Sequence, residues 1–192
     1  MLGRKKIKKI IFIINCLNVG GTEEQLLYFI KKVKKKFDIK IFSFSGGSLE
    51  NEFRDQGVVL KCGKNKFLSI FQLIYFLISN PTDVYHFFLP KSYIIGATLP
   101  FFSKKKKIMS RRSLNNYHRK YFFISLIIEK FLHQKMDKIL TNTISIKKQL
   151  ITTEGVKSNK IKVIPNLLIK KNKNSLRKKL NKSKIRKFGY VA

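Results

Sequence analysis

Residues 8–15 read Lys-Lys-Ile-Ile-Phe-Ile-Ile-Asn, and residues 20–24 read Gly-Gly-Thr-Glu-Glu. An unbroken apolar run of this length is typical of a β-strand that is buried on both faces, as in a parallel sheet. Residues 23–35 then follow a helical period, with apolar side chains on one face and lysines on the other. The apolar positions are Leu26, Leu27, Ile30 and Val33. A strand, a glycine turn and an amphipathic helix together predict the start of a βαβ unit.

The same alternation of short apolar runs and helical stretches continues along the chain. Further strands are predicted at residues 39–44, 58–62, 83–87, 107–110, 138–142 and 160–164. Helices are predicted at residues 48–56, 67–79, 91–102, 116–135 and 144–153, with Ser48 as the N-cap of the first of these. Strands that alternate with helices predict an α/β domain, built as a Rossmann-like parallel sheet with right-handed crossovers and helices on both faces.

The character of the sequence changes after Asn166. Residues 167–187 are dense in lysine and asparagine and poor in large apolar side chains, which indicates a basic linker. Residues 188–192 read Phe-Gly-Tyr-Val-Ala, which is typical of the beginning of a strand. We therefore expect one domain over residues 1–166, and at residues 188–192 the first strand of a second domain. A strand with nothing after it suggests either a truncated gene or a shortened chain.

The composition excludes several classes of protein. With 192 residues, 44% hydrophobic residues and 17 Phe, the chain can build a core, so it is not a disordered chain. Cys16 and Cys62 alone cannot form a disulfide framework, and their spacing matches no zinc site. No apolar run reaches the ~20 residues that a membrane-spanning helix needs. A buried strand explains the apolar run near the N-terminus better than a signal peptide does. We expect a cytoplasmic protein that can lie on the inner face of the membrane.

The net charge is the most unusual feature of the composition. Lys and Arg number 42 and Asp and Glu number 10, which gives a formal net charge of +32. So basic a chain fits nucleic acid, an anionic membrane surface or phosphorylated substrates as a partner. It also fits a genome rich in A and T, because Lys, Ile, Asn and Phe are abundant together. The charge alone does not choose between these explanations.

Glycine and polar residues gather at the ends of the predicted strands, where parallel α/β sheets bind ligands. A Gly-Gly turn lets the backbone approach a ligand, and the amides of a helix N-terminus suit a phosphate; a plain tight turn is the alternative. A pair of arginines suits a carboxylate or a phosphate, and a solvated basic loop is the alternative. A histidine at a strand end fits either a ligand site or a structural role. The candidates are Gly20, Gly21, Thr22, His86, Arg111, Arg112, Asn142 and Asn166.

Residues 121–135 combine apolar and basic side chains at helical spacing. A basic amphipathic helix that carries aromatic side chains is typical of a membrane interface. The same pattern is typical of a helix that packs on a sheet, and the two roles do not exclude each other. The residues predicted to contact a membrane or an acceptor are Arg119, Lys120, Phe122, Phe123 and Lys130.

Short motifs in a fixed order carry a resemblance to a known family. They are residues 18–23 (Asn-Val-Gly-Gly-Thr-Glu), 46–49 (Gly-Gly-Ser-Leu), 57–58 (Gly-Val), 83–86 (Asp-Val-Tyr-His), 110–113 (Ser-Arg-Arg-Ser), 137–143 (Asp-Lys-Ile-Leu-Thr-Asn-Thr) and 162–166 (Lys-Val-Ile-Pro-Asn). Together they resemble the N-terminal domain of a GT-B glycosyltransferase of family 4, over about residues 8–166 and again at 188–192. The sequence departs from the family where Ser110-Arg111-Arg112 replaces a common histidine, and where Leu167 replaces a common glycine.

The resemblance implies a retaining enzyme that moves a sugar from a nucleotide-sugar to a glycan or lipid-linked acceptor in cell-envelope polysaccharide biosynthesis. It implies that the strand-end candidates face a cleft between two domains, and that no metal or other cofactor is needed. It places the catalytic groups and most of the donor site in the second domain, so this chain alone is expected to be inactive. Two other functions stay open. One is a non-enzymatic basic module that binds nucleic acid or a membrane, although the sequence carries no nucleic-acid motif. The other is a different GT-B enzyme, such as a sugar epimerase.

Overall fold

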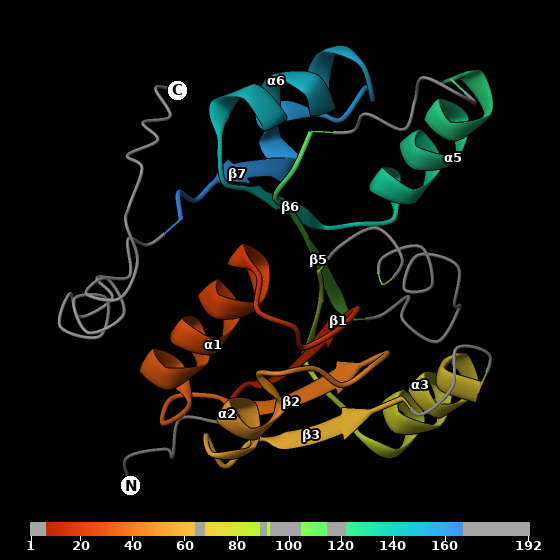
Figure 1. Cartoon of the computed structure of the whole chain (residues 1–192). Coiled ribbons are helices and arrows are strands. Elements are labelled where there is room, and N and C mark those ends of the chain that lie inside the picture. Colours follow the sequence, from red (N-terminus) through yellow and green to blue (C-terminus); the bar gives the residue numbers. More distant parts are fainter. Residues whose placement is uncertain (1–6, 64–67, 89–91, 93–104, 115–121, 167–192) are drawn as a thin grey trace, which may run out of the picture.

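The computed structural model describes residues 7–63, 68–88, 92, 105–114 and 122–166, and over residues 122–128 it describes the backbone and the side chain of Ile127. This part of the chain forms one seven-stranded sheet in the order β3-β2-β1-β4-β5-β6-β7 (Figure 1). All neighbouring strands run parallel. The strands are β1 (Lys9–Ile14), β2 (Asp38–Ser43), β3 (Val59–Cys62), β4 (Val84–Phe88), β5 (Lys106–Arg111), β6 (Lys138–Thr141) and β7 (Ile161–Val163). The predicted Rossmann-like parallel sheet is confirmed.

Helices cover both faces of this sheet, as predicted (Figure 1). They are α1 (Gly21–Val33), α2 (Glu50–Arg54), α3 (Leu68–Ser79), α5 (Phe122–Gln134) and α6 (Ile144–Thr152), and a short 3₁₀ helix spans Ser158–Lys160. The helices α1 and α2 pack on one face, and α3, α5 and α6 pack on the other. Each described helix is too short or too polar to cross a membrane.

The core consists of two apolar layers, one on each face of the sheet, and the interior strand β1 contributes side chains to both. Ile11 and Ile13 belong to the layer under α3, α5 and α6, together with Leu73 of α3. Phe12 and Ile14 belong to the layer under α1, together with Ile30. All four of these β1 side chains are almost completely buried, so the apolar run reports burial on both faces of the sheet. Each such side chain stabilises the fold by about 1.5–3 kcal/mol relative to an exposed one.

The elements predicted within the described residues are present, with ends close to the predicted ones. One detail was wrong. Ser48 does not cap α2, because Leu49 is the N-cap residue and no side chain caps this helix. The Leu49 amide instead donates to the carbonyl of Leu17 at 2.8 Å, which ties the start of α2 to the loop after β1. The helix predicted at 91–102, the start of the helix predicted at 116–135 and the assignments for 167–192 lie outside the described residues.

Candidate functional site

The alternation of side chains along β4 and β5 builds one wall of a cavity of about 400 Å³. The residues that line this wall are Val84, His86, Phe88, Ile108, Ser110 and Arg112. The opposite wall comes from α1, through Gln25, Leu26 and Phe29. The cavity runs along the sheet from Lys8 and Phe37, at the amino ends of the strands, to Asn142 and Pro165, at the carboxyl ends. Its lining is mainly apolar, and its polar groups gather at the carboxyl ends.

Arg112 is the cation at the carboxyl end of this cavity, and Lys8 lies at its other end. The Nη1 of Arg112 donates to Oδ1 of Asn166 at 2.6 Å, which joins the end of β5 to the segment after β7. The guanidinium carbon lies 5.9 Å from the ring centroid of Phe88, within reach of a cation–π contact. Burial lowers the pKa of Arg112, and the nearby carboxylate of Glu23 opposes that shift. A guanidinium that is half-buried and stacked on an aromatic ring is chemically suited to an anionic partner.

His86 of β4 lines the same cavity as Arg112. Its Nε2 is 2.8 Å from Oγ of Ser110, and its ring stacks on Phe88 with centroids 4.4 Å apart. Burial lowers the pKa of His86 to about 3, and the positive charge of Arg112 adds to this effect. The imidazole is therefore neutral near pH 7, and its Nε2 can donate a hydrogen bond to Ser110 or accept one from it, depending on the tautomer.

Three buried polar atoms at the carboxyl edge have no hydrogen-bond partner among the residues that the structure describes. They are Oδ1 of Asn15 after β1, Nε of Arg112 after β5 and Oδ1 of Asn142 after β6. Buried polar atoms are nearly always satisfied, so such a group marks a place where an ordered water, a ligand or a further part of a protein supplies the missing partner. The three residues follow different strands and meet at one edge of the sheet.

The Gly20-Gly21-Thr22 turn also lies at this edge, but these residues do not line the cavity. Helix α1 begins at Gly21, and the Gly20 carbonyl accepts from the Glu24 amide at 2.9 Å. A methyl group at Gly20 would meet Oε2 of Glu23 at 2.5 Å, whereas Gly21 has open space. Because Glu23 and Glu24 occupy the first turn, the positive end of α1 already faces carboxylates. This weakens the expectation that the turn alone attracts a phosphate.

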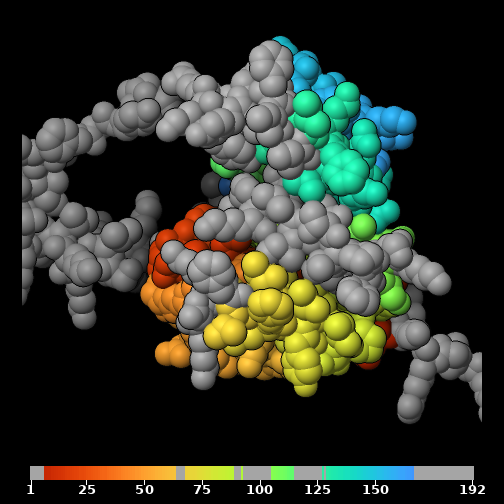
Figure 2. Space-filling view, turned by 90° about the vertical axis from the view of Figure 1, so that its right-hand side faces the viewer, coloured from red at the N-terminus to blue at the C-terminus, as the bar shows by residue number. Residues whose placement is uncertain are grey.

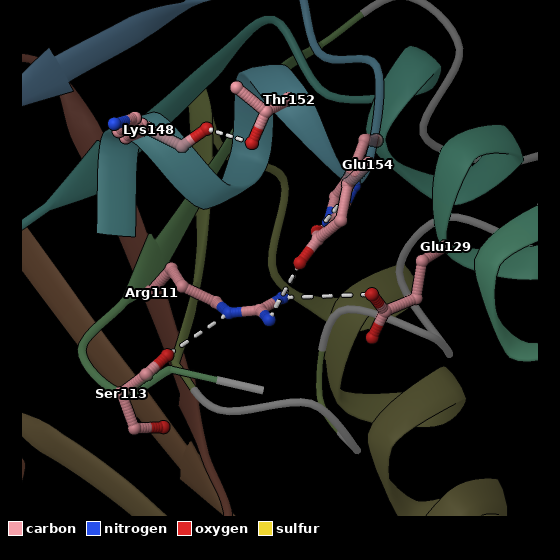
Figure 3. Close-up of polar contacts among 7 residues, drawn as sticks. Arg111, Ser113, Glu129, Lys148, Thr152 and Glu154 are labelled. Atoms are coloured by element: carbon pink, nitrogen blue, oxygen red, sulfur yellow. Dashed lines mark hydrogen bonds and ion pairs between the residues drawn. The ribbon is translucent and has the colours of Figure 1, made fainter. Parts of the chain in front are cut away.

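Arg111 corrects the prediction that both arginines face the cleft. It is the last residue of β5, and the alternation of the strand turns it to the other face of the sheet, away from Arg112. Its Nη2 lies 2.9 Å from Oε1 of Glu154, and its Nη1 lies 3.9 Å from Oε2 of Glu129 (Figure 3). Its Nε donates to the carbonyl of Ser113 at 3.3 Å. Arg111 is 4% exposed, so its role in this structure is to hold α5 and α6 to the end of β5.

The buried cluster around Arg111 was not predicted. Glu154 also faces His133, whose Nδ1 lies 3.3 Å from Oε2 of the carboxylate. Burial raises the pKa of Glu154 to about 7, against the opposing charge of Arg111, and burial lowers the pKa of His133 to about 4. Acidic residues are scarce in this chain, and this scarcity was the available signal that Glu129 and Glu154 have specific basic partners.

Helix α5 packs on the sheet, as one of the two predicted roles requires. Leu132 and His133 are buried, so His133 is not part of an outward basic face. Lys130 is exposed, and Ile127 and Phe131 are exposed apolar residues of the same helix. Of the other residues predicted to contact a membrane or acceptor, Arg119 and Lys120 lie outside the described residues, as do the side chains of Phe122 and Phe123.

The structure thus separates the candidates into three groups. His86, Arg112 and Asn142 line one cavity, and Asn166 joins them through its bond to Arg112. The Gly20-Gly21-Thr22 turn lies nearby at the same sheet edge, and Arg111 lies on the opposite face. Asn15 and Ser110 lie in the strand-end segments that sequence reasoning pointed to, because strand ends meet at one edge of a parallel sheet. The pairing of Ser110 with His86 was not predicted.

Comparison with known proteins gives this fold and site a family. The family model for Glycosyltransferase Family 4 matches residues 19–168. Among solved structures, HepE (Alr3699) of Anabaena, crystallised with UDP and glucose, is 15% identical with a TM-score of 0.70 over 90% of this chain and 50% of that chain. The lipopolysaccharide outer core galactosyltransferase WaaB is 17% identical with a TM-score of 0.59, over 83% of this chain and 46% of that chain.

A UDP-N-acetylglucosamine 2-epimerase is 12% identical, with a TM-score of 0.59 over 84% of this chain and 49% of that chain. No curated protein sequence matches. At these identities the solved structures show the shared fold, and the chain spans about half the length of each of them. The family model covers most of the described sheet, from the turn before α1 to the segment after β7. The chain belongs to Glycosyltransferase Family 4.

Proposed function

We propose that this chain is the acceptor-side half of a retaining glycosyltransferase. A sugar passes from a nucleotide-sugar donor to a glycan or lipid-linked acceptor during synthesis of a cell-envelope polysaccharide. Family membership supports sugar transfer. The HepE structure with UDP and glucose supports a nucleotide-sugar donor, and the WaaB structure supports a cell-envelope acceptor.

The observation that carries the proposal is the polar group at the carboxyl edge of the sheet. Arg112 presents a cation there beside Asn166, and its Nε has no partner among the described residues. The side-chain oxygens of Asn15 and Asn142 likewise have no hydrogen-bond partner among the described residues. An arginine fork suits a phosphate, and amide oxygens suit sugar hydroxyls. This set fits an acceptor that carries both, such as a sugar on a lipid diphosphate.

The donor is proposed to lie mainly on a second domain. Residues 167–187 then act as the linker, and residues 188–192 begin that domain. The Gly20-Gly21-Thr22 turn faces the transferring sugar rather than a free phosphate, because Glu23 and Glu24 already occupy the end of α1. No metal or other cofactor takes part in this proposal, and the catalytic residues remain unassigned. The chain by itself is expected to give no transfer.

The place of action in this proposal is the cytoplasmic face of the inner membrane. The net charge of +32 supports it, because the cytoplasmic leaflet is anionic and attracts basic surfaces. Arg119, Lys120, Phe122, Phe123 and Lys130 remain the residues of α5 and its preceding segment that we assign to the membrane or the acceptor. Nucleic acid is not a partner in this proposal.

Calorimetric titration of the chain with farnesyl diphosphate, a small lipid diphosphate, tests the proposal. Binding is expected, and Arg112→Gln should weaken it about tenfold, since one charge-assisted hydrogen-bond pair is lost. The control is Lys157→Gln, which removes an exposed charge outside the cavity and should leave binding unchanged. Equal affinities for the parent chain and Arg112→Gln would contradict the proposed acceptor site.

The epimerase alternative is separated by a different measurement. A sugar epimerase inverts a carbon of the nucleotide-sugar without an acceptor, whereas a transferase leaves the donor intact or hydrolyses it. NMR spectra of UDP-N-acetylglucosamine, incubated with the protein joined to its second domain, distinguish these products. Appearance of the 2-epimer would favour the epimerase.

A further inference from the structure

Helix α3 is unlike every other described helix, because none of its residues is charged. Its inner face packs into the core through Leu73, Phe76 and Leu77. A helix at the surface normally carries polar side chains on its outer face. In α3 the outer face is apolar as well, although 27% of the whole chain is charged.

The outer row of α3 consists of Leu68, Phe71, Tyr75 and Ile78, with exposed fractions of 55%, 71%, 74% and 62%. The spacing of three, four and three residues places them along one stripe of the helix. A contiguous apolar stripe that includes two aromatic rings marks a surface that another body covers. Scattered exposed apolar residues would not have this regular spacing.

Basic side chains lie near one end of this stripe. The amide of Lys106 donates to the carbonyl of Asp83, just after α3, at 3.3 Å, so the exposed Lys105 and Lys106 lie near the end of the helix. Figure 2 shows α3 and α5 on the same face of the molecule. Helix α5 adds exposed Phe131, and the Nζ of Lys135 lies 5.0 Å from the centroid of that ring.

The positive charge of the chain favours one of the possible partners that could cover this stripe. A second copy of the chain carries the same +32 charge, so two copies repel each other. A nucleic acid offers phosphates, which have no charged partner on α3. An anionic bilayer accepts both features, since apolar and aromatic side chains enter its interface and each nearby lysine adds about 1 kcal/mol.

We propose that the outer row of α3 inserts into the interface of an anionic lipid bilayer, with the helix lying parallel to the membrane surface. Tyr75 and Phe71 sit at the level of the lipid head groups, where aromatic side chains are favoured. The exposed lysines at the end of α3 and on α5 contact lipid phosphates. The inserted row lies on α3 and not on residues 121–135, which the sequence pointed to and which here supply basic side chains. The inference extends the proposed membrane location and does not depend on sugar transfer.

The chain contains no Trp, which makes a direct test possible. Tyr75→Trp places the single tryptophan of the chain in the outer row of α3, where it can be excited selectively at a longer wavelength than tyrosine absorbs. With vesicles of phosphatidylglycerol and phosphatidylcholine, its emission should shift to shorter wavelength, and lipids brominated on the acyl chains should quench it. Ile144→Trp, at the start of α6, is the control at a residue that is 77% exposed, and its emission should not change.

A second variant tests the row without a fluorophore. Phe71→Ser with Tyr75→Ser should lower the fraction of protein that sediments with these vesicles, with an affinity about tenfold weaker, since two buried rings are lost. Ile144→Ser should bind like the parent chain. No donor or acceptor is present, so the outcome is independent of the proposed transferase activity.

Three results would overturn the inference. The Tyr75→Trp emission could stay unchanged with vesicles. It could instead shift with protein concentration in the absence of lipid, which would assign the row to a second copy. Vesicle binding could also survive the double serine variant and vanish when Lys130 and Lys135 are changed to Gln, which would leave attraction by charge alone.

Discussion

Arg111 and Arg112 are neighbours in the chain and do different physical work. Arg111 is buried with two carboxylates between β5, α5 and α6, and Arg112 lines the cavity on the other face. Replacement of a buried cation leaves carboxylates in a medium of low polarity, which costs about 3–5 kcal/mol. We expect Arg111→Met to lose this much stability in urea unfolding at pH 8. Arg112→Met is the matched control and should lose much less, because its guanidinium is half-exposed.

The ion pair of Arg111 with Glu154 predicts that the stability of the fold depends on pH. In the folded protein the pKa of Glu154 is about 7, above its ordinary value of 4.5, so folding favours the protonated carboxyl. Such a group stabilises the fold fully below its unfolded pKa, and that contribution is lost as pH rises through the folded pKa. Without Arg111 this loss of stability with rising pH is larger, because its positive charge no longer stabilises the ionised carboxylate. The defect of Arg111→Met should therefore shrink at pH 5, and Glu154→Gln should restore part of its stability at pH 8. A defect that is equal at both pH values would contradict this account.

At the scale of elements, two glycines show which turns the fold requires. A methyl group at Gly47 would clash with the backbone carbonyl group of Leu17, where the start of α2 meets the loop after β1. Gly47→Ala should therefore cost about 1–3 kcal/mol, because this backbone contact must open. At Gly21, the first residue of α1, nothing lies within 4 Å of the added methyl group. Gly21→Ala should leave the melting temperature unchanged or raise it, since alanine favours a helix by about 1 kcal/mol. Equal losses at the two positions would show that the Leu17 contact is unimportant.

The contact between Gly47 and Leu17 also explains which elements were predictable from the sequence. The strands and helices follow from hydrophobic period, which is local, so β1 and α1 were found close to their true ends. The N-cap of α2 was missed because a hydrogen bond from Leu49 to Leu17 decides it, and that bond joins distant parts of the chain. The opposite directions of Arg111 and Arg112 follow from strand alternation, and were missed because the pair was treated as one loop. The partners of Arg111 on α5 and after α6 depend on tertiary packing, which no spacing in the sequence reveals.

At the scale of the whole molecule, the net positive charge lowers the stability of the folded state. The excess of 42 basic over 10 acidic residues means that most basic side chains have no acidic neighbour and repel one another. Raising the ionic strength from about 0.01 M to about 0.15 M shortens the screening length from about 30 Å to about 8 Å. Screening then weakens the repulsion more than it weakens the few surface ion pairs, such as Arg54 with Glu50.

The melting temperature should therefore rise by several degrees when sodium chloride is added over this range, as measured by circular dichroism. The increase is expected to depend on ionic strength and not on the anion, because screening needs no specific site. Sodium sulfate at equal ionic strength provides the comparison at these low concentrations. A much larger increase with sulfate would mean that a bound anion, rather than screening, stabilises the protein, and Arg112→Gln would then show whether the carboxyl edge of the sheet is where that anion binds. A fall in melting temperature with salt would mean that attractive ion pairs outweigh the repulsion of this very basic chain.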